Sequence, residues 1–263
     1  MASRGSVLGL IVACLSATAL ATAGLPATAL AKAGAAPAPA RVNCDALIII
    51  GQARGYTWYT NCYLLYGPNR EGLIIDVGAN GQQVVEAIRR RNVKLRYIVL
   101  THGHVDHMAA LAEVKAATGA QIISHPDDLD DQGRPKDAHY FDEGPEKKVQ
   151  PPADRTVVDG DVIELDGIRL EVMHTPGHAP GHIAFLMGDI LFAGDNLFYH
   201  TIGRTNFKDG SGDQALLFNS IRTRFFTLPD DTIVLPGHEQ PTTIGEERLN
   251  NPWVGEAAAR WGS

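Results

Sequence analysis

The stretch THGHVDH, residues 101–107, places three histidines and one aspartate in close succession. Imidazole nitrogens and carboxylate oxygens are the ligands that zinc and its first-row neighbours take in proteins. The stretch directly follows the apolar residues Tyr97–Leu100, which are typical of a buried strand. Ligand-type side chains at a strand end, before a helical pattern, are typical of an open catalytic site. The sequence therefore predicts a metal site at this point of the chain.

The spacing divides these ligands into two pairs. His102 and His104 are two residues apart, so in an extended segment both side chains leave the same face and can share one metal. Asp106 and His107 are neighbours whose side chains diverge, so they can serve a second metal close to the first. The alternative is a polar turn with hydrogen-bonded histidines, which the clustering of four ligand-type residues disfavours.

Composition restricts the class of protein. The chain has 263 residues, of which 44% are hydrophobic and 20% charged, as in ordinary globular proteins. The formal net charge is −7 and no basic stripe is present, which argues against nucleic acid as a partner. We therefore expect a small-molecule substrate, and the oligomeric state is left open.

The first forty residues differ from the rest. Arg4 precedes the apolar stretch Val7–Leu20, and small residues suited to cleavage follow, so residues 1–33 are predicted to be a secretory signal peptide. Residues 34–42 are predicted to be an Ala/Pro linker. A membrane span needs ~20 strongly apolar residues, more than this stretch offers. The Ile11–Cys14 segment lies too early to favour lipoprotein anchoring. We expect export to the periplasm or beyond, with no membrane span after cleavage.

Beyond the linker, two β-rich halves follow each other without a break in composition. The first predicts five strands and two helices: Ala46–Ile50, Asn61–Tyr66, Gly72–Asp76, Tyr97–Leu100 and Gln121–Ser124, with helices Gln82–Arg91 and Met108–Thr118. The second predicts five strands and one helix: Val162–Leu165, Ile168–Met173, Ile183–Met187, Ile190–Ala193 and Thr232–Leu235, with helix Asp213–Thr227. Residues 43–263 are thus predicted to form a single α+β domain of two packed sheets with helices outside. The polar connection 125–155 is either a binding loop or lid, or a surface insertion.

Cys44 and Cys62 are the cysteines of the predicted mature chain. An exported protein can bridge such a pair, but Cys62 lies in a predicted strand and is more typical of a buried apolar residue.

Three further ligand-type residues share one context. His178 in TPGH, Asp195 in AGD and His238 in PGH each follow a predicted strand and a glycine. A glycine lets the backbone approach a crowded centre closely. With the first motif they supply five histidines and two aspartates.

The ordered set THxHxDH, TPGH, GD and PGH resembles the metallo-β-lactamase superfamily over residues 43–263. The GRTNF segment at 203–207 and the TTIGEER segment at 242–248 resemble its hydroxyacylglutathione hydrolase (glyoxalase II) branch. The resemblance implies a four-layer αββα sandwich. Full glyoxalase II enzymes carry a C-terminal helical domain that holds glutathione, and we expect this chain to lack it, since the sequence ends soon after Pro252.

The resemblance also implies roles for the ligands. His102, His104 and His178 hold one metal, and Asp106, His107 and His238 hold the second. Asp195 bridges the two, and Asp106 and Asp195 are the catalytic carboxylates. The metals are expected to be two Zn²⁺ ions, with iron or manganese as alternatives. A hydroxide held between them would attack an acyl carbonyl.

Further residues are expected around this site. Asp76 and His182 would support the ligands without binding metal, and Arg204 would pair with a carboxylate of the substrate. Tyr199 and His200 are expected to line the pocket. His125, His139 and His174 have no motif support and are predicted to be ordinary.

These expectations favour a binuclear hydrolase that acts on a thioester or related acyl substrate. A secreted β-lactamase or lactonase is the first alternative, favoured by export and disfavoured by the GRTNF and TTIGEER segments. A persulfide dioxygenase with a single iron is the second, disfavoured by the complete second ligand set. A non-catalytic binding protein is disfavoured by the presence of all seven ligands.

Overall fold

The computed structural model describes residues 42–53, 56–137 and 149–258. Its first sheet has the strand order β1-β2-β3-β4-β5-β6. Strands β1, β2 and β3 are antiparallel, whereas β3, β4, β5 and β6 are parallel. The strand bounds are β1 Asn43–Ala53, β2 Tyr56–Tyr66, β3 Glu71–Ile75, β4 Lys94–Val99, β5 Gln121–Ser124 and β6 Arg155–Thr156.

The second sheet has the order β14-β13-β10-β9-β8-β7. Only β10 and β13 pair in parallel within it. Its bounds are β7 Val162–Leu165, β8 Ile168–His174, β9 Ile183–Met187, β10 Ile190–Gly194, β13 Ile233–Pro236 and β14 Thr242–Thr243. The short strands β11 (Leu197–Phe198) and β12 (Thr201–Ile202) pair with each other.

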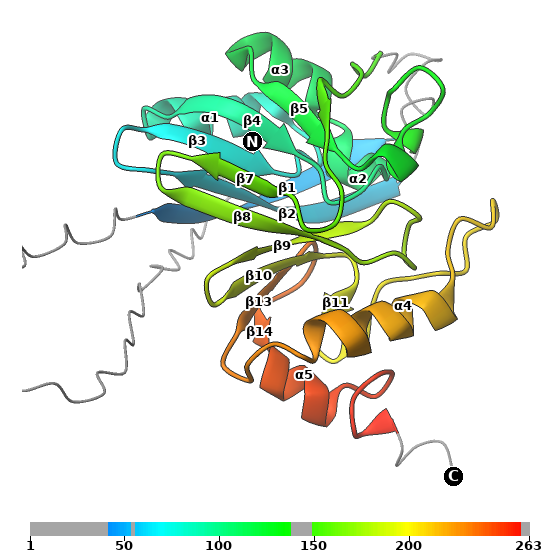
Figure 1. The fold of residues 1–263 in the computed structure, drawn as a ribbon. Coiled ribbons are helices and arrows are strands. Elements are labelled where there is room, and N and C mark those ends of the chain that lie inside the picture. The colour runs from blue at the N-terminus through cyan, green and yellow to red at the C-terminus, as the bar shows by residue number, and fades with distance from the viewer. Residues whose placement is uncertain (1–41, 54–55, 138–148, 259–263) are drawn as a thin grey trace, which may run out of the picture.

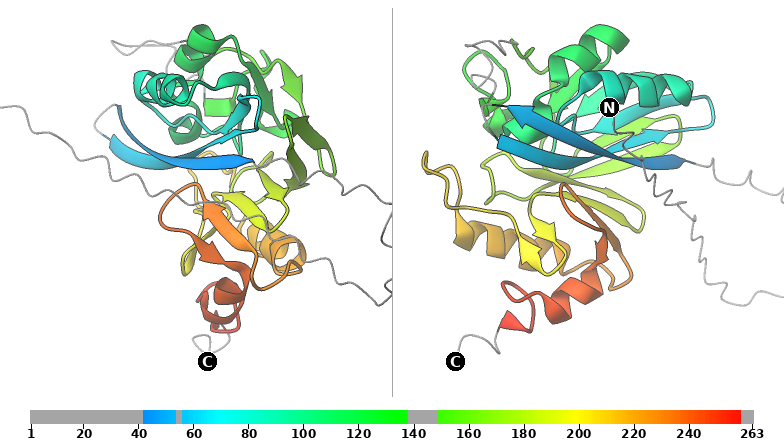
Figure 2. Two further views of the ribbon diagram at one scale, coloured as in Figure 1. Left: turned by 90° about the vertical axis from the view of Figure 1, so that its left-hand side faces the viewer. Right: turned by 180° about the vertical axis from the view of Figure 1, so that it is seen from behind.

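Helices cover the outer face of each sheet. The first sheet carries α1 (Gly81–Arg90) and α3 (Leu111–Thr118), and the second carries α4 (Gln214–Ser220) and α5 (Ile244–Asn250) (Figure 1). The turned views show the same sequence of layers (Figure 2). The fold is therefore the four-layer αββα sandwich of class α+β that the sequence predicts. The remaining helical segments are α2 Val105–Met108, the 3-10 helix η1 Pro126–Asp128 and the π-helix η3 Ile221–Phe225.

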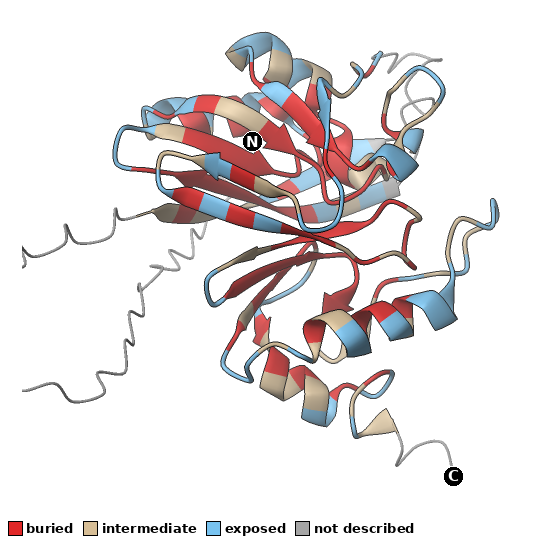
Figure 3. Ribbon diagram, in the orientation of Figure 1, coloured by how far each residue is buried: buried red, intermediate tan, exposed pale blue. Residues whose placement is uncertain are grey.

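The core explains why the apolar runs form central strands. Successive side chains of a strand point to opposite faces, so a strand between two covered faces is apolar throughout. In β3, Leu73 and Ile75 pack between the two sheets, whereas Ile74 packs against the helices of the first sheet. In β10, Phe192 faces the other sheet and Leu191 faces α4 and η3. Buried residues accordingly dominate the central strands (Figure 3).

Some predicted bounds differ from the structure. Strands β1 and β2 extend well beyond 46–50 and 61–66, because they pair with each other along their whole length and not every residue needs an apolar environment. The predicted helix 108–118 begins later, as α3 at Leu111, because Ala110 has a non-helical φ of −98° and ψ of 7°, and Met108 instead ends the separate helix α2. Helix 213–227 is replaced by α4 and η3. The sequence missed α5, whose IGEERLN sequence carries few apolar residues.

Cys44 and Cys62 are both buried, and neither is part of a disulfide. Cys44 packs between the two sheets and Cys62 packs against the helices of the first sheet, so the two lie on opposite faces. Burial raises the pKa of Cys62 to about 12, which makes it an inert core residue. No disulfide joins the pair, in line with the interpretation of Cys62 as an apolar residue.

Residues 1–33, 34–41 and His139 lie outside the described part of the chain. Among the residues that are described, no helix has the length and apolar character needed to cross a membrane.

Candidate metal centre

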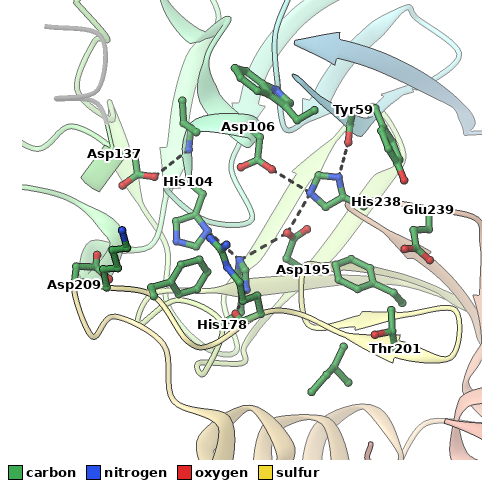
Figure 4. Close-up of a pocket in the computed structure, with 17 residues that line it drawn as sticks. Tyr59, His104, Asp106, Asp137, His178, Asp195, Thr201, Asp209, His238 and Glu239 are labelled. Atoms are coloured by element: carbon green, nitrogen blue, oxygen red, sulfur yellow. Dashed lines mark hydrogen bonds and ion pairs between the residues drawn. The ribbon is translucent and has the colours of Figure 1, made fainter. Parts of the chain in front are cut away.

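Strand ends bring the predicted ligands to one edge of the sandwich. The THGHVDH stretch follows β4, His178 follows β8, Asp195 follows β10 and His238 follows β13. The parallel strands of each sheet end at this edge, so the loops that follow them meet there. The side chains of His104, His178, Asp195 and His238 converge at the centre of Figure 4.

One group of nitrogens comes from His102, His104 and His178, and we call it the imidazole cage. The Nε2 atom of His178 lies 3.2 Å from Nε2 of His102 and 2.9 Å from Nδ1 of His104. The other nitrogen of His178, Nδ1, donates to the carbonyl oxygen of Arg204 at 2.7 Å, which leaves a lone pair on Nε2. Burial lowers the pKa of His102 well below its ordinary range and that of His178 to about 4. The rings of His102 and His178 are therefore neutral.

A second group contains Asp106, His107, Asp195 and His238, and we call it the carboxylate cage. His238 Nε2 lies 3.2 Å from an oxygen of Asp106 and 3.2 Å from an oxygen of Asp195. Although burial lowers the pKa of His238, the two carboxylates raise it to about 10. Burial also lowers the pKa of His107, but the negative charges of Asp195, Asp76 and Asp106 raise it by more. The pKa of His107 is therefore well above its ordinary range. The carboxylates of this cage therefore attract positive charge, either as protons on the two rings or as a metal ion in their place.

Asp195 lies between the two cages. One of its oxygens is 3.7 Å from His178 and 3.2 Å from His238, and the other is 3.2 Å from His107 Nε2. Burial would raise the pKa of Asp195, but His107 and His238 hold it well below its ordinary range. It is the residue of the set placed to contact an ion in either cage.

The hydrogen-bonding pattern shows that these residues fit metal ions. His107 Nδ1 donates to Asp76 and His238 Nδ1 donates to the carbonyl oxygen of Tyr59, so in both rings Nε2 is the nitrogen left to bind either a proton or a metal ion. His107 Nε2 then faces Asp195 Oδ1, a buried oxygen that accepts no hydrogen bond. A ring nitrogen and a carboxylate oxygen this close need a cation between them, and a metal ion can take the place of the proton there. In the imidazole cage the lone pair of His178 Nε2 likewise points at the nitrogens of His102 and His104.

Asp76 connects both cages, as expected of a supporting residue. It is 1% exposed and accepts hydrogen bonds from His107 Nδ1, from the Thr101 N–H and from the Thr101 hydroxyl, each at 2.8 Å. The Thr101 hydroxyl oxygen lies 3.0 Å from His102 Nδ1. If His102 donates to this oxygen, one chain of hydrogen bonds orients a ring in each cage.

His182 lies behind Asp195 and does not point into either cage. Its Nε2 accepts the backbone N–H of Asp195 at 3.0 Å, and its Nδ1 lies 3.1 Å from the Thr175 hydroxyl oxygen. A Cβ on Gly194 would lie 2.5 Å from His182 Nε2, which explains the glycine of the AGD motif. The structure thus places His182 as a support of the Asp195 loop.

A pocket of about 1020 Å³ opens onto the ligands. The guanidinium of Arg204 lies 4.4 Å from the centre of the Phe207 ring at the wall of this pocket. Tyr199 and His200 do not line the pocket, contrary to expectation, because His200 Nε2 pairs with Glu246 at 2.8 Å and Tyr199 stacks on the His200 ring. The sequence missed much of the lining: Trp58, Tyr59, Asp137, Phe198, Thr201, Ile202, Phe207, Lys208, Asp209 and Glu239.

His125 and His174 form a separate cluster with Asp127. Their rings stack with centroids 4.2 Å apart. His125 Nδ1 accepts the Asp127 N–H at 3.2 Å, and His174 Nε2 donates to the carbonyl oxygen of Pro180 at 2.9 Å. Each ring therefore uses one nitrogen on the backbone, as structural histidines do.

Comparison with known proteins defines the class. The family model described as the metallo-beta-lactamase superfamily matches residues 55–238, and the chain belongs to this superfamily. Its fold and ligand-type clusters are those of a metallo-hydrolase of that family.

Individual relatives narrow the comparison. The hydroxyacylglutathione hydrolase GloC of Haemophilus influenzae is 35% identical over 205 residues, which cover 74% of this chain and 92% of GloC. The crystal structure of the B3 metallo-beta-lactamase BLEG-1 matches with a TM-score of 0.67 and 29% identity, covering 80% of this chain and 99% of that chain. TTHA1623, solved in a di-iron-bound form, matches with a TM-score of 0.65 and 30% identity, and the match covers 78% of this chain and 98% of the TTHA1623 chain.

Proposed function

We propose that this protein is a hydrolase with two metal ions that cleaves a thioester or a related acyl bond. The observation that carries the proposal is the position of Asp195 between two complete ligand cages. The 35% identity to a hydroxyacylglutathione hydrolase favours a thioester substrate. No serine or cysteine nucleophile is required by this arrangement.

The imidazole cage would hold one ion and the carboxylate cage the other, with Asp195 shared. Bound metal supplies a water molecule of lowered pKa and polarises the carbonyl group that is attacked. Mixed nitrogen and oxygen ligands suit zinc, iron and manganese. We propose that the two ions are Zn²⁺. Iron is the alternative, because the similar protein TTHA1623 was solved in a di-iron-bound form.

The chain's own residues would bind and orient the reactants. Asp106 and Asp195 both line the pocket, where their oxygens can accept hydrogen bonds from the attacking water. Arg204, held over Phe207, presents donors that match a free carboxylate on the substrate. Trp58, Phe198 and Phe207 give the pocket apolar walls for the acyl group or its leaving thiol.

A cyclic amide or lactone is the second candidate substrate class. The 0.67 TM-score and 29% identity to a B3 metallo-beta-lactamase favour it, because that match covers 99% of the lactamase chain. The two candidates share the ligand cages and differ in what the pocket accepts.

A substrate panel tests the proposal. Purified protein would be assayed with S-lactoylglutathione, a thioester without glutathione, nitrocefin and a homoserine lactone, with Asp195→Ala as the inactive control. We expect a thioester to give the highest kcat/KM, and metal analysis to give about two ions per chain. Faster turnover of nitrocefin or the lactone would transfer the assignment to the second class. A single tightly bound iron with oxygen uptake on persulfide would overturn hydrolysis altogether.

We also propose that residues 1–33 direct export and are then removed, which leaves a chain that begins with the linker 34–42. The composition of the first forty residues supports this proposal. N-terminal sequencing of protein recovered from the periplasm and the culture medium tests it, since an intact Met1 in the recovered protein would refute cleavage.

A further inference from the structure

Asp128 is a buried carboxylate that contacts two metal-ligand loops. It ends η1, within the connection 125–155, and is 2% exposed. One of its oxygens accepts the backbone N–H of Gly103 at 2.6 Å, and the other accepts the backbone N–H of Gly181 at 3.1 Å. A single side chain thus joins two segments that lie far apart in the sequence.

The two glycines belong to loops from different sheets. Gly103 lies between His102 and His104 after β4, and Gly181 lies between His178 and His182 after β8. All three histidines of the imidazole cage are therefore on the two loops that Asp128 joins.

The residues of the carboxylate cage are held in other ways. Asp106 and His107 lie in α2, whereas Asp195 and His238 lie on the loops after β10 and β13. Within the described part of the chain, the Asp128 carboxylate accepts hydrogen bonds from Gly103 and Gly181 and from none of these loops. Its contacts are selective for one cage.

Close packing makes this contact specific. A Cβ on Gly181 would lie 2.5 Å from the backbone nitrogen of Asp128, and a Cβ on Gly103 would lie 3.0 Å from its carbonyl oxygen. The backbone of η1 therefore lies directly against both loops. The side chain of Asp128 has little room to move. Its two oxygens are therefore held in place to accept the N–H groups of Gly103 and Gly181.

We propose that Asp128 is a positioning residue that sets the geometry of the imidazole cage and so its metal affinity, independently of the carboxylate cage. This inference rests on the proposed function, in which both cages hold a metal ion. Its physical basis is that neutral imidazoles bind a cation through the direction of their lone pairs, and Asp128 fixes the backbone from which they project.

The test measures Zn²⁺ binding by competition with a chelator, on the folded full-length protein. The variants are Asp128→Ala, which removes both acceptors, and Asp128→Asn, which keeps one oxygen and places an amide N–H₂ against the other donor. Asp166→Asn is the matched control, because Asp166 also accepts two backbone N–H groups, those of Asn69 and Glu71, away from the cages. We expect each Asp128 variant to lose roughly 10- to 100-fold in affinity at one site only, the range seen for residues that orient metal ligands.

Double variants assign the affected site. Asp128→Ala should add little to His104→Ala, which already disrupts the imidazole cage, and should keep its full effect in His238→Ala, which disrupts the other. Unchanged binding, an equal loss at both sites, or unfolding of both Asp128 variants while Asp166→Asn stays folded would overturn the positioning role. Fewer than two ions on the unaltered protein would instead refute the proposed function, so the two failures are distinguishable.

Discussion

The imidazole cage and the carboxylate cage attract a cation by different means. In the first, His102 and His178 are buried, and burial lowers the pKa of both, so these rings offer lone pairs without charge. The second contains two carboxylates, whose negative charge raises the pKa of His107 and His238 and attracts a cation. An interaction through lone pairs depends on direction, whereas an interaction with charge tolerates displacement. The imidazole cage should therefore depend more on the backbone that positions it.

The largest expected effect removes the residue that the two cages share. Asp195→Ala deletes the carboxylate that faces His107, His178 and His238. We expect both metal affinities to fall and turnover to drop by roughly three orders of magnitude, as for residues that act as a unit. Zinc analysis and kcat/KM measure these effects, and Asp189→Ala, in an exposed turn, is the control. Full activity in Asp195→Ala would end the shared-ligand interpretation.

A matched pair of substitutions sharpens the comparison. His104 and His238 are both partly exposed ligand-type histidines, one in each cage. His104→Ala leaves two neutral rings, whereas His238→Ala leaves two carboxylates and a ring. We expect roughly 100-fold weaker zinc binding at the altered site in the first variant and roughly 10-fold in the second. Equal losses of zinc affinity in the two variants would contradict the idea that the imidazole cage depends on lone-pair direction and the carboxylate cage on charge.

Asp76→Ala should affect both cages and the stability of the fold. It leaves the Thr101 N–H and His107 Nδ1–H without their acceptor in a buried site. Each buried unsatisfied donor costs about 1–3 kcal/mol, so we expect unfolding to become easier by roughly 3 kcal/mol. Urea denaturation of the metal-free protein measures this, because metal binding then makes no contribution to the difference. A loss confined to metal binding would show that Asp76 orients rings without supporting the fold.

The smallest expected effect concerns His182. His182→Gln keeps a side-chain acceptor near the Asp195 N–H and adds no charge to the cages. We expect less than about a tenfold loss in kcat/KM, with roughly 1 kcal/mol of lost stability. Steady-state kinetics and thermal unfolding measure the two. A loss as large as that of Asp195→Ala would mean that His182 binds metal directly.

The ligand-type residues of the candidate site were easier to predict from the sequence than the residues that line the pocket around them. Ligand-type residues such as His178 and His238 stand after apolar strands and glycines, a local pattern that sequence displays directly. The prediction that Tyr199 and His200 line the pocket was wrong, because closeness to Asp195 in the sequence does not decide where a side chain points. The ion pair with Glu246 of α5 holds the His200 ring away from the pocket. The lining residue Trp58 was missed because it lies in the extended β1–β2 hairpin, whose length depends on pairing.

Sequence by itself determined the ligand types and the strands they follow, because metal chemistry and side-chain periodicity are read within a few neighbouring residues, and the resemblance of its motifs to a known superfamily implied the αββα class. Tertiary structure alone decided which nitrogen of each ring faces the centre, since the partners that fix it lie far away, as Arg204 does for His178 and Tyr59 for His238. It also revealed the bridge by Asp128 between two loops, a contact that no local pattern indicates. The division has a physical reason: composition sets what a site can bind, and long-range packing sets where each atom points.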